Sequence, residues 1–286
     1  MSTTIRRVVL TGVLAALAGA QAWAVTFINT CPFVITVPGN YVVTKDLLPC
    51  PNGGIYIQVS HVTVNLNGHI IAGLPAEPVA TGISVNPGAI PHLNQIGISG
   101  PGLIQGFSTG ISIQDSDYVQ VSLTAVAGNA AGGISASNVT YLTVGGNVIA
   151  GSPSASGLVL QGSAGAQVTG NQMVGNNGAG ILLNSGNSNV LTGNVASGNA
   201  GGGIVLGPGP LSNSRVSSNT TNGNGKAGIW IQPLTASSLG NEIFSNTSSV
   251  GNLTWDLEDD NAPPPCGTDF WSSNVFLTKN PASCIN

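Results

Sequence analysis

The chain has 286 residues, of which only 6% are charged and 42% are hydrophobic, and its formal net charge is −4. Nucleic acids and anionic membrane surfaces attract clustered cations, so this composition argues against either of them as a partner. The 41 glycines and the many Asn, Ser and Thr residues suit a tightly turning all-β fold better than a disordered chain.

Residues 1–24 have the features of a secretory signal peptide. Arg6 and Arg7 form a basic start, an uncharged apolar run follows from Val8 to Ala20, and Ala22-Trp-Ala is a small-x-small cleavage signal. The apolar run is too short to span a bilayer. We therefore expect cleavage after Ala24, no membrane span, and a secreted protein that is periplasmic or extracellular.

The four cysteines lie near the two ends of the chain, with Cys31 and Cys50 in the first segment and Cys266 and Cys284 in the last. An exported protein meets oxidising conditions, so an even number of cysteines indicates disulfides. Three pairings are open. The favoured one joins Cys31 to Cys50 and Cys266 to Cys284, because each pair lies within one terminal segment. Residues 25–53 and 253–286 are accordingly interpreted as caps, each clamped by a disulfide.

Between the caps, residues 54–252 repeat a pattern in which a glycine precedes alternating apolar residues. The units are 23 to 28 residues long, and each holds short strand-like segments joined by tight turns. One unit cannot bury its apolar face alone, so the units must stack. The pattern predicts an all-β, single-stranded parallel β-helix of about eight coils, each about 4.8 Å above the last. The repeated glycines are Gly54, Gly82, Gly110, Gly133, Gly157, Gly180, Gly203 and Gly228.

Aligning the units places asparagines in two columns, which we expect to point inward and to bond to the coils above and below. The first column contains Asn147, Asn171, Asn194, Asn219 and Asn241. The second, five residues further along each unit, contains Asn176, Asn199, Asn224 and Asn246.

Several segments resemble one known family. Tyr41-Val-Val-Thr-Lys-Asp-Leu and Val62-Thr-Val-Asn-Leu-Asn-Gly look like the opening coil of secreted right-handed parallel β-helix proteins of the pectate-lyase-like superfamily. The later Thr-Gly-Asn and Ser-Gly-Asn units resemble NosD-type and general β-helix repeats. The ending at Trp255-Asp-Leu-Glu-Asp-Asp is similar to C-terminal modules of bacterial members. The resemblance implies a right-handed β-helix and leaves its function open, because the superfamily contains lyases, hydrolases, epimerases and adhesins.

Two functions from different classes are open, the first resting mainly on this resemblance and the second on the low charge and a carboxylate-free middle of the chain. The first is the binding or processing of extracellular polysaccharide, and the alternative is a non-catalytic structural or adhesin-like envelope protein; in either case we expect a monomer. No Asp or Glu occurs between Tyr118 and Asn241, and neither an Arg-x-Lys nor an Asp-Pro-His motif is present. The paired carboxylates of glycosidic chemistry are therefore missing from the middle of the chain, and whether the protein is an enzyme stays open.

One group of residues could act in catalysis. If Val62, Ile96 and Val119 are equivalent, His61 and the neighbouring His92 and Asp117 share one face of the rod, where a histidine–carboxylate pair would suit a general base. The alternative is that all three are turn residues facing water.

Two further candidates lie towards the C-terminus. Oxygen ligands suited to Ca²⁺ cluster at the acidic run, although a solvated, repulsive end is the favoured interpretation of the run; no other cofactor is required. Alternation would point Trp255 and Leu257 inward. Trp230 falls at an outward strand position and could stack on a sugar ring. The acidic run comprises Asp256, Glu258, Asp259 and Asp260.

Overall fold

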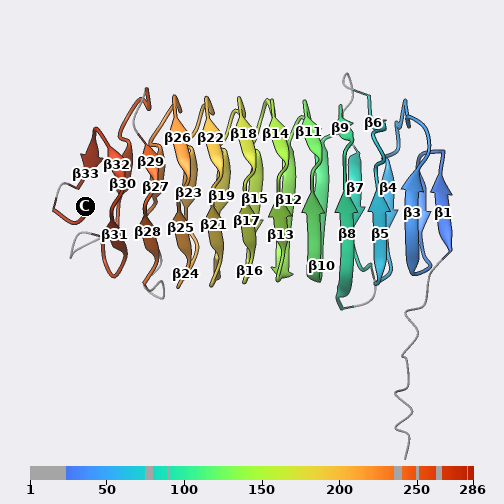
Figure 1. Ribbon diagram of the computed structural model, residues 1–286, viewed down its shortest axis with the longest axis horizontal. Coiled ribbons are helices and arrows are strands. Elements are labelled where there is room, and N and C mark those ends of the chain that lie inside the picture. The colour runs from blue at the N-terminus through green and yellow to red at the C-terminus, as the bar shows by residue number, and fades with distance from the viewer. Residues whose placement is uncertain are drawn as a thin grey trace, which may run out of the picture.

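The computed structural model describes residues 24–74, 80–88, 91–234, 240–248, 251–261, 266–281 and 283–286. In these ranges the chain forms 33 short strands and no helix. The strands wind into a rod of about ten stacked coils (Figure 1), close to the eight that the repeat predicts. The expected signal peptide lies outside the described residues, apart from Ala24. Nothing within the described ranges forms a helix long and apolar enough to cross a bilayer.

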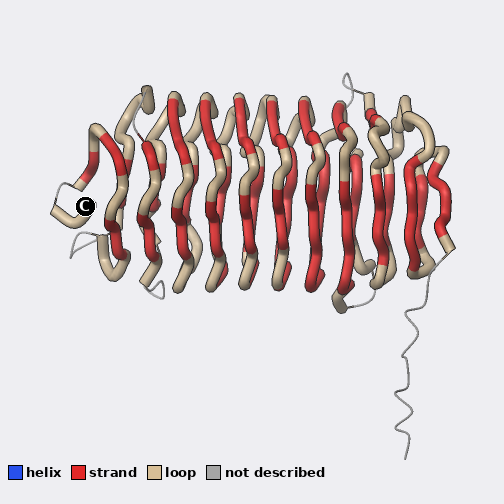
Figure 2. Tube along the Cα trace, in the orientation of Figure 1, coloured by secondary structure: helices blue, strands red, loops and turns tan. Residues whose placement is uncertain are grey.

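Each coil contributes strands to three faces, and Figure 2 shows these strands alternating with short turns along the rod. The first face consists of the strands at the repeated glycines, together with β2, β30 and β33 at the two ends, all paired in parallel. It contains β2 (Phe33–Ile35), β4 (Ile55–Ile57), β7 (Thr81–Val85), the first part of β10 (Thr109–Ser122), the first part of β12 (Gly132–Thr140), β15 (Leu158–Gln161), β19 (Ile181–Leu183), β23 (Ile204–Leu206), β27 (Ile229–Ile231), β30 (Leu257–Asp259) and β33 (Lys279–Asn280).

The second face follows after a sharp corner. It contains β1 (Val25–Ile28), β3 (Gly39–Val43), β5 (Val62–Asn65), β8 (Leu93–Ser99), the second part of β10, β13 (Thr143–Gly145), β17 (Gln167–Thr169), β21 (Val190–Thr192), β25 (Arg215–Ser217), β28 (Glu242–Phe244) and β31 (Phe270–Ser272). Three two-residue strands pair along the corner itself, namely β16 (Ser163–Ala164), β20 (Gly186–Asn187) and β24 (Leu211–Ser212).

The third face forms a separate sheet and closes each coil. It contains β6 (Ile70–Ala72), β9 (Leu103–Gln105), β11 (Ala125–Ala127), β14 (Val148–Ala150), β18 (Gln172–Val174), β22 (Val195–Ser197), β26 (Thr220–Asn222), β29 (Thr247–Ser248) and β32 (Val275–Phe276). Inward side chains from the three faces make one continuous core along the rod, in which Ile111, Val121 and Val126 of a single coil are completely buried.

The segments interpreted as caps also contribute strands to the stack. Residues 25–53 supply β1, β2 and β3, and residues 253–286 supply β30 to β33. The favoured disulfide pairing is confirmed: Cys31 bonds to Cys50 with Cα atoms 5.5 Å apart, and Cys266 bonds to Cys284 with Cα atoms 6.2 Å apart. Each disulfide therefore closes a loop within one end of the rod.

The asparagine columns form hydrogen-bonded ladders, as the repeat predicts for most of their members. In the first ladder each Asn Nδ2 donates to the Oδ1 of the next coil, from Asn147 through Asn171 and Asn194 to Asn219, at 2.9 to 3.0 Å. In the second, Asn176, Asn199 and Asn224 bond in the same way. All are buried, so the ladders satisfy polar groups inside the core.

The predicted positions of Asn241 and Asn246 in these columns are wrong. Asn219 donates to Asn246 at 3.0 Å, so Asn246 belongs to the first ladder, and the second continues instead from Asn224 to Asn252. Asn241 belongs to a third ladder, in which its Nδ2 donates to Asp269 at 2.8 Å.

An insertion explains the error. Paired residues of β23 and β27 are 25 positions apart in the sequence, whereas paired residues of β25 and β28 are 27 positions apart. Two extra residues therefore enter between β27 and β28 and displace every later position relative to a constant repeat.

Candidate functional site

The corner between the first and second faces is lined by residues with left-handed backbone. His61, Gln95, Tyr118 and Tyr141 have φ angles of 60°, 56°, 54° and 56°. This conformation turns the chain sharply. The four residues occupy equivalent positions in successive coils, because the residues next to them pair in parallel. The predicted register at this corner is thus confirmed. The exposed rings of Tyr118 and Tyr141 stack with centroids 5.0 Å apart.

The predicted catalytic residues form two separate pairs at this corner. His92 Nδ1 lies 3.4 Å from Asp117 Oδ2, and His61 Nδ1 lies 2.6 Å from Gln95 Oε1. The structure therefore brings His92 and Asp117 together but gives His61 a different partner. A catalytic role for the three residues stays a prediction.

An open groove of about 280 Å³ lies on the outer surface of the first face beside Trp230. Leu182, Val205 and Trp230 hold equivalent outward positions in successive coils, since Leu182 pairs with Val205 and Val205 with Trp230. Val205 is only 4% exposed, although it points away from the core. The three side chains form an apolar strip along the rod, in which Leu182 and Trp230 are partly exposed and the almost covered Val205 lies between them.

Polar groups surround this strip. Lys226 Nζ lies 5.2 Å from the centre of the Trp230 ring, and the indole Nε1 donates to Asp260 Oδ2 at 2.8 Å. Asn177 and Gln232 also line the groove, whereas none of its described lining residues is Asp or Glu. Such a surface can contact the apolar face of a sugar ring and hydrogen-bond its hydroxyl groups. Two carboxylates stand beside it, because Asp260 accepts from the indole and Glu258 pairs with Trp230 in the next coil.

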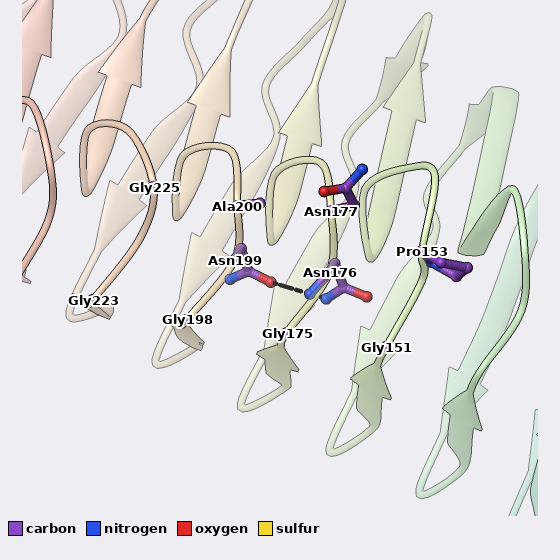
Figure 3. Close-up of a pocket in the computed structure, with 10 residues that line it drawn as sticks. All are labelled: Gly151, Pro153, Gly175, Asn176, Asn177, Gly198, Asn199, Ala200, Gly223 and Gly225. Carbon is purple, nitrogen blue, oxygen red and sulfur yellow. Dashed lines mark hydrogen bonds between the residues drawn. The ribbon is translucent and has the colours of Figure 1, made fainter.

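A second groove, of about 500 Å³, runs over the turns between the third and first faces (Figure 3). Turn glycines form much of its lining, and the ladder residues Asn176 and Asn199 lie in it, joined by a hydrogen bond (Figure 3). It shares Asn177 and Ala200 with the Trp230 groove. The two hollows therefore adjoin along the same coils, and the second adds backbone and amide surface beside the apolar strip.

Asp256 does not point outward as the alternation predicts. Its side chain is buried, and its Oδ2 accepts hydrogen bonds from the backbone N–H groups of Leu277 and Thr278 at 2.8 and 2.9 Å. Trp255, expected inside, is 37% exposed. The reason is that Asp256 stands where the next repeated glycine would lie, since its carbonyl accepts from Ile229 N–H just as earlier glycine carbonyls do.

The other carboxylates of the acidic run have different surroundings. Asp259 lies in the core, in register with Ile231, and accepts a hydrogen bond from Trp271 Nε1 at 2.9 Å. Burial raises the pKa of Asp259 to about 6. Burial also raises the pKa of Glu258, which lies beside Asp260. Across the part of the chain that the structure describes, no three acidic, His or Cys side chains converge as metal ligands. Calcium binding stays a prediction.

A family model described as "Right handed beta helix region" matches residues 81–248. The chain belongs to this right-handed β-helix family. No curated protein sequence matches it. The family and the structure agree on the handedness and on the parallel stack, and the pectate-lyase-like resemblance is confirmed at the level of the fold.

Solved structures extend the likeness in fold. The Dettilon tailspike protein superposes with a TM-score of 0.66 and 14% identity, covering 88% of this chain and 55% of its own. The DFA-IIIase of Arthrobacter chlorophenolicus A6 superposes with a TM-score of 0.61 and 13% identity, covering 83% of this chain and 69% of its own. The periplasmic alginate epimerase AlgG superposes with a TM-score of 0.54 and 16% identity, covering 84% of this chain and 70% of its own. The chain spans about half the length of the tailspike, and at these identities the likeness shows the fold alone.

Proposed function

We propose that the chain is an exported protein that binds a polysaccharide in the Trp230 groove. The observation that carries this proposal is the strip of Leu182, Val205 and Trp230 in an open groove bordered by the amides of Asn177 and Gln232. An apolar strip along a rod suits an extended polymer, because successive sugar rings can lie on successive coils.

Three observations support this function. Proteins of similar fold include an alginate epimerase and a DFA-IIIase solved in complex with GF2, although fold likeness does not transfer an activity. The two disulfides fit an oxidising compartment outside the cytoplasm. Asn177, Lys226 and Gln232 line the groove and can hydrogen-bond the hydroxyl groups of a sugar.

The test is a comparison of dissociation constants by isothermal titration calorimetry against soluble uronate and neutral polysaccharides. For a polymer that binds, Trp230→Ala should raise the Kd at least tenfold, which is about 1.4 kcal/mol, because the largest apolar contact is removed. Trp230→Phe should retain most of the affinity, because a ring face remains.

Tyr118→Ala is the matched control, since Tyr118 is an exposed aromatic residue on the corner, outside the groove lining. It should leave the Kd unchanged. Binding that survives Trp230→Ala, or that is lost equally in Tyr118→Ala, would refute the groove as the binding site, and an absence of binding to every polymer would refute the function.

A second candidate function is polysaccharide processing, which the 3.4 Å contact between His92 and Asp117 favours by supplying a general base. Under this alternative, incubation with uronate polymers yields an unsaturated or epimerised product. The triple replacement of His61, His92 and Asp117 by Ala would abolish that product and leave binding at Trp230 intact.

A further inference from the structure

The N-terminal end of the rod carries two strand edges that no described strand covers. β1 pairs only with β3, and β2 pairs only with β4; Figure 1 shows β1 as the outermost strand at that end. An edge of this kind presents unpaired N–H and C=O groups, which pair with another chain unless charge, a bulge or a covering segment prevents it.

Charge does not protect this end. Residues 24–44 contain no Lys, Arg, Asp, Glu or His, and the side chains of Phe27 and Val37 are 63% and 60% exposed. A groove of about 470 Å³, lined by Thr26, Phe33 and Tyr41 among others, opens between the two edges. The side chains of this segment are therefore uncharged, and charges near this end come from Lys45 and Asp46, which line a neighbouring hollow, and from the α-ammonium that cleavage after Ala24 would give Val25.

The opposite end has different properties. Its last first-face strand, β33, has two residues and is followed by Pro281, which has no N–H to donate. Ile285 is buried there, and the Cys266–Cys284 disulfide closes the segment. The acidic run, Asp256 to Asp260, lies in the coil beneath. Only Glu258 and Asp260 of this run are partly exposed, and this end offers no long strand edge to β1 or β2.

We propose that two copies of this chain associate head to head through their N-terminal ends. A two-fold axis relates the two copies, so that their β1 strands pair in antiparallel fashion and satisfy each other's unpaired backbone groups. The same arrangement places the groove at the end of one copy against that of the other. Such a contact is closed, and assembly stops at two copies. This proposal replaces the monomer expected from the sequence, and it is independent of glycan binding.

The test is sedimentation velocity on the exported protein, with its N-terminus established by mass spectrometry, from 1 to 100 µM. A dimer should form across this range. Thr26→Lys and Val37→Lys each place a positive charge opposite its own copy and should raise the dimer dissociation constant at least tenfold. Leu277→Lys, at an exposed apolar residue of the other end (77% exposed), is the matched control and should leave the dimer unchanged.

Hydrogen exchange on the unmodified protein provides a measurement that needs no variant. Amides of residues 25–35 should exchange more slowly as the protein concentration rises. A monomer at 100 µM, a dimer insensitive to both N-terminal substitutions, or assemblies that grow beyond two copies would each overturn the proposal. A protein that retains residues 1–23 and is a monomer would also overturn the proposal, because residues 1–23 would then cover the N-terminal end in place of a second copy.

Discussion

Gly180 illustrates why glycine recurs at one point of every coil. A Cβ atom built there would lie 2.7 Å from the carbonyl oxygen of Gly203 and 2.9 Å from the Cβ of Ala196. Neither neighbour can move without disturbing the next coil. We expect Gly180→Ala to lower the free energy of unfolding by about 3 kcal/mol, at the upper end of overpacking effects, as measured by urea denaturation.

Gly175→Ala is the control for this prediction. Gly175 has a φ of 64°, but a Cβ atom there would meet nothing within 4 Å. Only the backbone conformation opposes the substitution, so the expected loss is about 1 kcal/mol. Equal losses at the two glycines would show that close approach between coils is not the reason for the repeat.

Asp259 makes the stability of the C-terminal coils depend on pH. Its folded pKa of about 6 exceeds the ordinary value of 3.8 because the carboxyl is buried. Below pH 3.8 both the folded and the unfolded chain hold this proton. Between 3.8 and 6 only the folded chain holds it, so the free energy of unfolding falls as the pH rises through this window.

The melting temperature of the unmodified protein should therefore be higher at pH 4.5 than at pH 6.5, by an amount equivalent to about 1 to 3 kcal/mol. Asp259→Asn, which carries no charge at either pH, should reduce this difference. Some difference should remain, because burial also raises the pKa of Asp269. A melting temperature that rises from pH 4.5 to 6.5 would contradict the buried position of Asp259.

At the scale of elements, the asparagine ladders hold neighbouring coils in register. Asn194 Oδ1 accepts from both the backbone N–H and the side chain of Asn171, and its Nδ2 donates to Val168 O and to Asn219 Oδ1. Asn194→Ala leaves these buried groups without partners and should lower the free energy of unfolding by about 2 to 4 kcal/mol. The exposed Asn177→Ala should change it by less than about 0.5 kcal/mol. Thermal denaturation of the two variants would separate these expectations.

The elements also show where sequence reasoning succeeds and fails. The repeat predicts the strands, the register at the corner and most ladder positions, because each is copied from coil to coil. It misplaces Asn241 and Asn246, because two inserted residues break the constant spacing. It also misplaces Asp256 and Trp255, since alternation holds only within a strand and β30 begins at Leu257.

The Trp230 groove was only partly predictable. Trp230 itself stands out, but the strip depends on the outward position of neighbouring units. That position is serine at Ser84, Ser112 and Ser135 and becomes aliphatic at Val159 and Leu182. This change is visible in the sequence once the units are aligned. By contrast, the contact of Trp230 with Asp260 depends on how separate coils stack, and local sequence does not encode it. Lys226, which also contacts the ring, lies only four residues before Trp230.

At the scale of the whole molecule, the rod has distinct surfaces along its length. The corner carries stacked tyrosines and the His92–Asp117 pair, the first face carries the Trp230 groove, and the N-terminal end carries the uncharged strand edges. A repeated scaffold allows this separation, because outward residues can change without altering the core that each coil buries. The fold is thus set by what recurs, and the proposed function by what differs between coils.

A crystal structure of the protein soaked with the oligosaccharide that binds most tightly in solution would test the proposed function most directly. We predict electron density for a sugar ring against Trp230, with the chain continuing over Val205 towards Leu182. Density at the His92–Asp117 corner instead, or an empty groove in a lattice that leaves it open, would contradict glycan binding at Trp230.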